Sequence, residues 1–172
     1  MKPEFNIMID IETLSQYKTA AVVSIGAVKF TDTEIVDTFY TNIDPTSAKD
    51  LGLHISTSTI NWWKEQKPEA FAALRQSRKD IHTALDEFSS WYGKESVPTW
   101  ANGPDFDLVI LENAYMKCEK KHPWEFWHAR CFRTFKNLFV DRSFKLEGVA
   151  HNALDDATHQ ANYIQHIMRK SK

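Results

Sequence analysis

The sequence has no long apolar run, and this absence argues against a helical membrane protein. None of its segments approaches the roughly 18 consecutive apolar residues that a membrane-spanning helix needs. The first residues, Met1-Lys2-Pro3-Glu4, also lack the apolar segment of a secretory signal. We therefore expect a cytosolic protein with no membrane contact.

Cysteine is also scarce. Cys118 and Cys131 are the two cysteines of the chain, and neither stands at a ligand-type spacing from its neighbours. Both fall in segments whose pattern predicts helix. We expect buried or free thiols in a reducing compartment, rather than a disulfide or a zinc site.

The chain lacks an excess of positive charge. Its net charge is -2 at pH 7, which is not typical of a protein that binds nucleic acid through its overall charge. The distribution is uneven, because residues 117–145 hold eight lysines and arginines against three acids. Two interpretations of this basic segment stay open: a surface that guides a phosphate chain, or the solvated face of helices.

The remaining pattern predicts one mixed α/β domain over residues 1–172, without repeats or a linker. Residues 5–11, 22–30 and 35–43 favour three strands in an antiparallel meander. Alternating helices and a strand follow, with helical patterns at 58–66, 80–92, 104–118, 131–140 and 153–169 and a strand at 97–101. Strands followed by alternating elements indicate a mixed sheet with helices packed on both faces.

The first strand carries two acids where apolar residues are expected. Side chains two positions apart share one face of a strand, so Asp10 and Glu12 share a side opposite Ile9 and Ile11. By strand rise their carboxylates lie roughly 7 Å apart. Two like charges on a buried strand are costly unless a cation lies between them, and a divalent cation would serve.

A third acid faces inward from the helix at 104–118. Asn102-Gly103-Pro104 predicts a turn into this helix, with Pro104 at about its first position. Asp107, Leu111, Ala114 and Cys118 then share one face, which is the apolar face. Asp105 falls in the first turn, where a carboxylate favours the helix dipole and needs no further role.

The last helix adds a fourth acid and a histidine. Its apolar stripe includes Leu154 and Met168, and Asp156 lies on the flank of that stripe while Asp155 points away. His151 precedes the helix by about one turn, so it can approach the same place as Asp156. A histidine before a helix is also a common cap or surface residue, and both interpretations stay open.

Together these acids predict a metal centre. Asp10, Glu12, Asp107 and Asp156 lie on three elements that a mixed sheet can bring together. Oxygen ligands of this kind suit Mg²⁺ or Mn²⁺ better than zinc. Two such ions about 4 Å apart can activate a water and stabilise the leaving oxygen of a phosphodiester. His151 is then free to take the proton of that water.

At this point the residues resemble a known family, the DEDDh 3'-to-5' exonucleases, which have the ribonuclease H-like fold. Its three motifs are similar, in order, to "DIET" at 10–13 with "SIGAV" at 24–28, "NGPDFDLVIL" at 102–111 and "LEGVAHNALDDA" at 146–157. A histidine five residues before the last aspartate is typical of the His-type branch. The segment "TINWWKEQ" at 59–66 resembles the phage-encoded, exonuclease VIII-like branch.

The resemblance implies a reaction and a role for each residue. It implies hydrolysis of single-stranded DNA or RNA from a free 3' end to 5'-mononucleotides, in a bacterial cytosol or that of a phage-infected cell. It implies that Asp10 bridges two Mg²⁺ or Mn²⁺ ions, that Glu12 and Asp156 complete the first site, that Asp107 serves the second, and that His151 is the general base. Many members form homodimers, so a homodimer is one expected state.

The chain departs from the family after "DIET", where many members have a glycine and this chain has Leu14-Ser15. The resemblance implies that this loop touches the terminal nucleotide, so Thr13 and Leu14 are the expected substrate contacts. Trp62 and Trp63 are adjacent on a helix, so at most one is expected to face a substrate, and packing in the core is the favoured interpretation of the pair. Arg133 and Lys136 are either phosphate contacts or ordinary residues of an amphipathic helix that turns Phe132, Phe135 and Phe139 inward.

Three alternatives to an exonuclease follow from the same residues. The first is a nucleic-acid-binding module of the same fold without hydrolytic activity. The second is a nuclease of this fold that cuts internally, which a circular single strand would reveal. The third is a structural domain whose inward acids are ion-paired, for which no metal-induced rise in melting temperature is expected.

Overall fold

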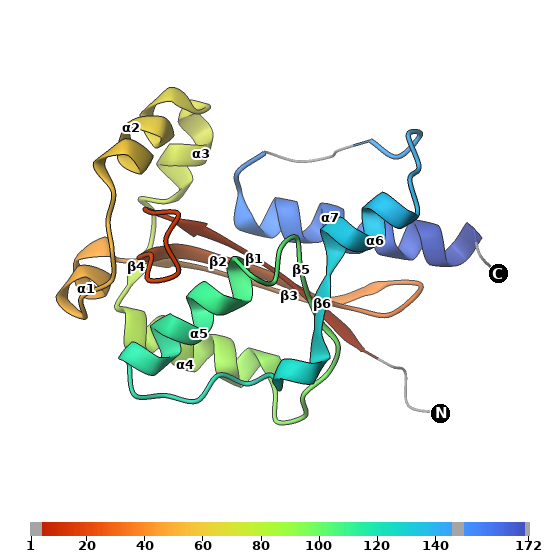
Figure 1. Ribbon diagram of the computed structural model, residues 1–172, viewed down its shortest axis with the longest axis horizontal. Helices are drawn as coiled ribbons and strands as arrows, with labels where there is room; N and C mark the ends of the chain where they lie inside the picture. Colours follow the sequence, from red (N-terminus) through yellow and green to blue (C-terminus); the bar gives the residue numbers. More distant parts are fainter. Residues whose placement is uncertain (1–4, 146–149, 171–172) are drawn as a thin grey trace.

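A six-stranded mixed sheet forms the middle of the fold (Figure 1). The computed structural model describes residues 5–145 and 150–170, so the first four residues of the motif at 146–157 lie outside the described residues. The strands are β1 (Asn6–Thr13), β2 (Val22–Phe30), β3 (Ile35–Ile43), β4 (Arg78–Lys79), β5 (Thr99–Ala101) and β6 (Ala129–Cys131). Their order across the sheet is β4-β3-β2-β1-β5-β6.

The first three strands form the predicted antiparallel meander. β2 and β3 have the predicted bounds, because few polar residues interrupt their apolar pattern. β1 continues beyond the predicted end at residue 11, since its pairing with β2 extends to Thr13. Glu12 therefore stands inside the ladder, opposite Ser24, and Asp10 stands opposite Gly26.

The remaining strands are short and parallel to their neighbours. β5 falls inside the predicted strand at 97–101 and pairs with β1. β4 and β6 were not predicted, because two or three residues are too few to show alternation. The prediction that Cys131 lies in a helix was wrong. It ends β6, and its sulfur caps the next helix by accepting a hydrogen bond from the Thr134 N–H.

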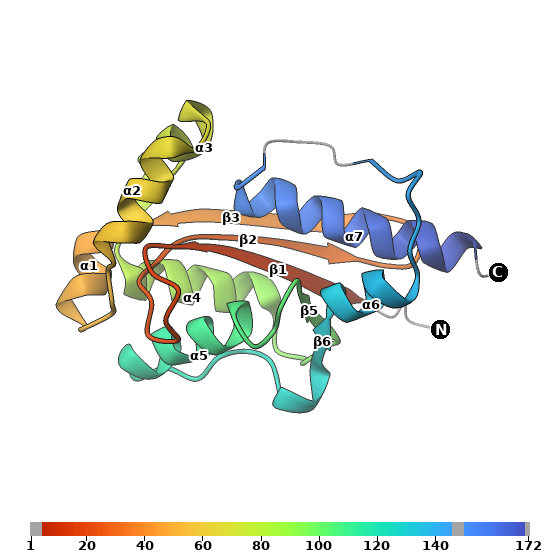
Figure 2. The ribbon, with the colours of Figure 1, turned by 45° about the horizontal axis from the view of Figure 1, so that its top comes forward.

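Helices cover both faces of the sheet, as predicted (Figure 2). α4 and α5 lie along one face and α7 along the other, while α2 and α3 stand at the end of the sheet away from the termini. Among the described helices, none combines the length and apolar character that a membrane span requires. The helices are α1 (Pro45–Asp50), α2 (Thr57–Glu65), α3 (Pro68–Ala73), α4 (Ile81–Tyr92), α5 (Asp107–Lys117), the 3-10 turn η1 (Phe126–His128), α6 (Phe132–Leu138) and α7 (Ala153–Lys170).

The two faces of β1 have different partners, which confirms the predicted alternation. Ile9 and Ile11 are buried in the hydrophobic core that contains residues of α4 and α5. Met8 belongs to a second core, formed with apolar residues of α7. Asp10 and Glu12 share the face of Met8, so the strand directs both acids toward α7.

α5 begins later than predicted. The N–H groups of Phe106 and Asp107 both donate to the Gly103 carbonyl, which makes residues 103–106 a turn and Asp107 the first helical residue. The predictions that Pro104 opens the helix and that Asp105 lies in its first turn were therefore wrong. The predicted inward face was right, because Asp107 and Cys118 are both buried. Cys118 and Cys131 are free thiols, as expected.

Gly26 lets the start of α7 lie directly on β2. A Cβ atom at this position would stand 2.2 Å from the carbonyl carbon of Ala153 and 2.2 Å from the nitrogen of Leu154. Because both obstacles are backbone atoms, Gly26→Ala is expected to lower the free energy of unfolding by about 3 kcal/mol. Urea unfolding measures this loss. Thr38→Ala, at an exposed position of β3, should cost no more than roughly 0.5 kcal/mol, and equal stability of the two variants would contradict the tight packing.

Candidate active site

Four carboxylates from three elements meet in one pocket beside α7. The pocket has a volume of about 460 Å³ and is lined by the predicted acids and histidine, together with residues of the turn before α5, of α6 and of α7. β1 supplies Asp10 and Glu12, α5 supplies Asp107, and α7 supplies Asp156. The structure thus brings together all five residues that the sequence singled out: Asp10, Glu12, Asp107, His151 and Asp156.

Asp107 is fixed by the backbone around it. Its Oδ1 accepts a hydrogen bond from the Ile11 N–H at 3.3 Å, and its Oδ2 accepts one from the Gly103 N–H at 3.4 Å. Burial raises the pKa of Asp107 to about 7, although these hydrogen bonds and the positive charge of Arg133 oppose the rise. The late start of α5 is what places this carboxylate against β1.

Asp10 lies at the centre of the cluster. Burial raises its pKa well above the ordinary value, and the negative charges of Asp107, Glu12 and Asp156 raise it further. The Gln160 side chain opposes this rise by donating from Nε2 to the Asp10 Oδ1 at 3.0 Å. Gln160 was not among the predicted site residues, although its position one turn after Asp156 on α7 places it on the same flank.

His151, just before α7, approaches Asp156 in the first turn of that helix. The His151 N–H donates to the Asp156 Oδ2 at 3.0 Å, and His151 has a φ of 64°, in the left-handed region. Its ring lies edge-on to Trp62, with 5.0 Å between ring centroids. One ligand atom each from Glu12, His151 and Asp156 lies within 4.8 Å of the others, so these three residues can hold a metal ion.

In the part of the chain that the structure describes, the charges of the four acids are offset only in part: Arg133 lowers the pKa of Asp107 without forming an ion pair. Among residues 5–145 and 150–170, no lysine or arginine forms an ion pair with any of the four carboxylates. Burial raises the pKa of Glu12 to about 8, and the negative charges of Asp156 and Asp107 add to that rise. Buried carboxylates without an ion-paired side chain fit divalent cations, whose charge would offset their repulsion.

A family model matches this chain over residues 5–168, and its description is the 3'-5' exoribonuclease Rv2179c-like domain. The chain belongs to this family. It is also 26% identical to an exodeoxyribonuclease of Enterobacteria phage T4, over 96% of this chain and 89% of the phage protein. The chain is thus a 3'-5' exonuclease.

Solved structures share the fold of this exonuclease. The nuclease domain of 3'hExo, a DEDDh family member bound to rAMP, aligns with a TM-score of 0.67 at 15% identity, over 98% of this chain and 94% of that one. Exonuclease I of E. coli in complex with a dT13 oligonucleotide aligns with a TM-score of 0.69 at 9% identity, over 95% of this chain and 41% of that one. These likenesses confirm the predicted ribonuclease H-like class of fold.

A second depression of the exonuclease lies beside the acids, between β1 and α2. It has a volume of about 330 Å³, and Glu12, Thr13, Trp62 and Phe106 are among the residues that line it. Trp62 is 41% exposed, whereas Trp63 is buried and donates from its indole nitrogen to the Thr13 carbonyl at 3.0 Å. Both tryptophans line the depression, but only Trp62 is exposed. Core packing, the favoured interpretation for both, therefore holds for Trp63 alone.

Thr13 and Leu14, the expected substrate contacts, take different places. Thr13 lines the depression beside the acids, and its hydroxyl donates to the Ser15 carbonyl at 2.6 Å. Leu14 is buried in a small apolar cluster with Val23 and Trp63. The structure thus places Thr13 next to Glu12 and directs Leu14 toward the packing between α2 and the sheet.

The raised pKa of Glu12 predicts how the metal-free exonuclease responds to pH. Because the folded-state pKa is about 8 and the ordinary value is 4.5, the folded chain holds a proton that the unfolded chain has lost between these pH values. Stability of the metal-free protein therefore falls as pH rises through this window. Glu12→Gln removes the cost, so at pH 8 and without metal the variant is expected to be more stable than the wild type by roughly 4 kcal/mol.

Urea unfolding with EDTA at pH 8 and at pH 4.5 measures this difference, which should vanish at the lower pH. Added Mn²⁺ should then stabilise the wild type more than Glu12→Gln, because the variant has lost a ligand. A Glu12→Gln variant that is less stable than the wild type at pH 8 without metal would show that the glutamate is a satisfied structural residue.

Proposed function

We propose that this exonuclease shortens single-stranded nucleic acid from its 3' end and releases 5'-mononucleotides. One observation carries the proposal: four carboxylates with raised pKa values, two of them buried, converge in one pocket next to a histidine, and none forms an ion pair with a lysine or arginine of the described residues. Such a cluster is costly to fold and is matched by a metal centre. Residues 1–172 would act as one domain in the cytosol, as a monomer or a homodimer.

The donor set fits Mg²⁺ or Mn²⁺, with Asp10, Glu12, Asp107 and Asp156 as the residues that would hold two ions. Bound ions of this kind lower the pKa of an attacking water and stabilise the charge that develops on the leaving oxygen. The protein's part is to hold the carboxylates in place. Gln160 orients Asp10, and the backbone N–H groups of Gly103 and Ile11 orient Asp107.

His151 is the proposed general base. A ring nitrogen of His151 would accept a proton from the attacking water, a task for which imidazole is suited near neutral pH. Its backbone is tied to Asp156 by the hydrogen bond from its N–H, and its ring rests against Trp62. These contacts hold the imidazole beside Glu12 and Asp156, where the reaction would take place.

Either sugar is compatible with the proposed reaction. The description of the matching family names an exoribonuclease, whereas the phage relative is named an exodeoxyribonuclease. The depression beside Glu12 is lined by the aromatic side chains of Trp62 and Phe106, which suit the face of any base. We therefore propose a single strand with a free 3' end as the substrate and leave the sugar to experiment.

The test is a gel time course with RNA and DNA oligomers of one sequence, labelled at the 5' end. With Mg²⁺ or Mn²⁺ we expect a ladder that shortens by one nucleotide at a time, and with EDTA no shortening. The faster oligomer identifies the preferred sugar. A circular single strand should remain intact, and its cleavage would favour the internal nuclease. Binding of the oligomer without shortening would favour the non-hydrolytic binding module.

A further inference from the structure

Two basic side chains stand at the edge of the acidic pocket. Arg133 and Lys136 lie three positions apart on α6, and both line the pocket that contains the four carboxylates. Residues at this spacing are neighbours on one face of a helix. Both side chains are exposed, whereas Asp107 and Glu12 in the same pocket are buried. The pocket thus has an acidic floor and a basic rim.

Within the described residues the two rim residues have no anionic partner, unlike Lys120 and Lys121 of the same basic segment. Lys120 pairs with Asp86 at 2.5 Å, and Lys121 pairs with Glu125 at 3.2 Å. Across the described part of the chain, neither Arg133 nor Lys136 forms an ion pair. The positive charge of Arg133 nevertheless lowers the pKa of Asp107. Its guanidinium therefore lies close to the acids without bonding to them.

The packing of the apolar residues of α6 only partly explains why Arg133 and Lys136 face the pocket. Phe132 is buried and Phe135 is partly buried against the core beside α7, as an amphipathic helix requires. Phe139 is 47% exposed, so the interpretation in which all three phenylalanines face inward is right for Phe132 and Phe135 and wrong for Phe139. Packing fixes the first turn of α6 on the sheet and leaves its polar face turned toward the pocket.

The geometry points to Arg133 and Lys136 as the site that binds the phosphate on the 5' side of the scissile bond, an inference that rests on the proposed exonuclease function. The scissile phosphate must reach the carboxylates on the floor of the pocket. The next phosphate along the strand then lies toward an exposed rim, where a guanidinium can bind it through two hydrogen bonds. Lys136 adds a second positive charge one turn further along α6.

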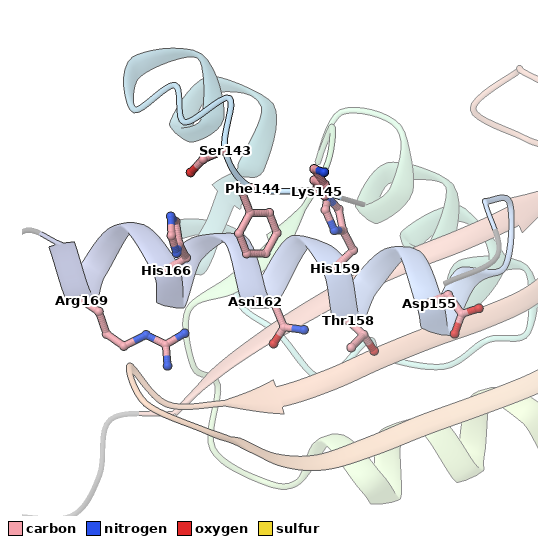
Figure 3. A pocket seen from close by; sticks show the side chains of 9 residues that line it. All are labelled: Ser143, Phe144, Lys145, Asp155, Thr158, His159, Asn162, His166 and Arg169. Carbon is pink, nitrogen blue, oxygen red and sulfur yellow. The ribbon is translucent and has the colours of Figure 1, made fainter. Parts of the chain in front are cut away.

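A groove along α7 offers the alternative route for the strand. It has a volume of about 620 Å³ and is lined by Lys145, His159, His166 and Arg169 among others (Figure 3). The positive charge of the groove is partly neutralised, because His166 contacts Asp141 at 2.8 Å. In addition, Phe144 lies over the helix between His159 and His166. Arg169→Ala is the matched control, since this substitution removes one positive charge from the groove, as Arg133→Ala does from the rim.

The experiment compares two substrates for each variant. One is a 5'-labelled single-stranded oligonucleotide, and the other is the p-nitrophenyl ester of thymidine 5'-monophosphate, which has a scissile phosphate and no phosphate beyond it. For Arg133→Ala we expect the ratio of kcat/KM on the oligonucleotide to that on the ester to fall about 10- to 50-fold, mainly through KM. Lys136→Ala should lower the ratio in the same direction, and Arg169→Ala should leave it at the wild-type value.

The dependence of KM on salt gives a second readout. Loss of one phosphate contact should reduce the slope of log KM against log salt by about 0.7 for a single strand. An equal loss on both substrates for Arg133→Ala would overturn the inference, because it would mean that the arginine acts through Asp107 or the scissile phosphate. A drop in the ratio for Arg169→Ala alone would overturn it in favour of the groove along α7. A wild-type protein inactive on both substrates would overturn the proposed function itself, and the inference with it.

Discussion

Asp10→Asn is expected to lower kcat on a single-stranded oligonucleotide by at least roughly 1,000-fold. Asp10 is the carboxylate whose pKa is raised by all three other acids, so it lies where their fields overlap. Asparagine keeps the shape and an oxygen that can accept the hydrogen bond from Gln160, but it lacks the charge that would bind a cation. The substitution therefore removes one function of the side chain and preserves its packing.

Two measurements accompany this variant. The melting temperature of metal-free Asp10→Asn should equal or exceed that of the wild type, because a repelling charge has been removed. Asp105→Asn is the matched control, since Asp105 is an exposed carboxylate in the turn just before Asp107. It should retain activity within twofold. Residual activity of Asp10→Asn close to the wild-type value would remove Asp10 from the proposed metal centre.

His151→Gln is expected to lower kcat by about 100- to 10,000-fold, the range typical of a lost general base. The four carboxylates remain in this variant, so the rise in melting temperature produced by Mn²⁺ should be preserved. The combination of lost turnover and retained metal binding is the signature of a base. His82→Gln, at an exposed position at the start of α4, should behave as the wild type.

A different result would assign His151 another role. Its ring lies close enough to Glu12 and Asp156 to act as a third ligand for a metal ion. If His151→Gln abolished the stabilisation by Mn²⁺ together with activity, the histidine would be a ligand and the proton acceptor would have to be sought elsewhere. Thermal unfolding with and without Mn²⁺ separates the two roles.

Much of the fold could be predicted because its central elements have strong periodic patterns. β2 and β3 match their predicted bounds, and α4 and α7 agree within about one residue of theirs. The alternation of β1 correctly directed Asp10 and Glu12 away from the face of Ile9 and Ile11. The acids could be recognised because a charge on a buried strand or on an apolar helix face contradicts the local pattern.

The rest depends on contacts between segments that are distant in the sequence. The sheet pairing that defines β6 comes from β5, and the start of α5 is set by hydrogen bonds to the Gly103 carbonyl. The contact of Trp62 with His151 joins residues from two different helical regions. The position of Leu14 is likewise decided by its packing with Trp63. The periodic pattern within one segment gives no information about contacts between distant segments.

The measurement that tests the central claim most directly is calorimetric titration of Mn²⁺ into the metal-free protein, in two buffers of different ionisation enthalpy at pH 6.5. Because burial and mutual repulsion raise the pKa values of the acids, part of the cluster is protonated at this pH. We expect binding to release on the order of one proton from the wild type, and Asp10→Asn to bind at least roughly tenfold more weakly. Equal binding by the two proteins, or no binding by the wild type, would contradict the assignment of these carboxylates as a metal centre.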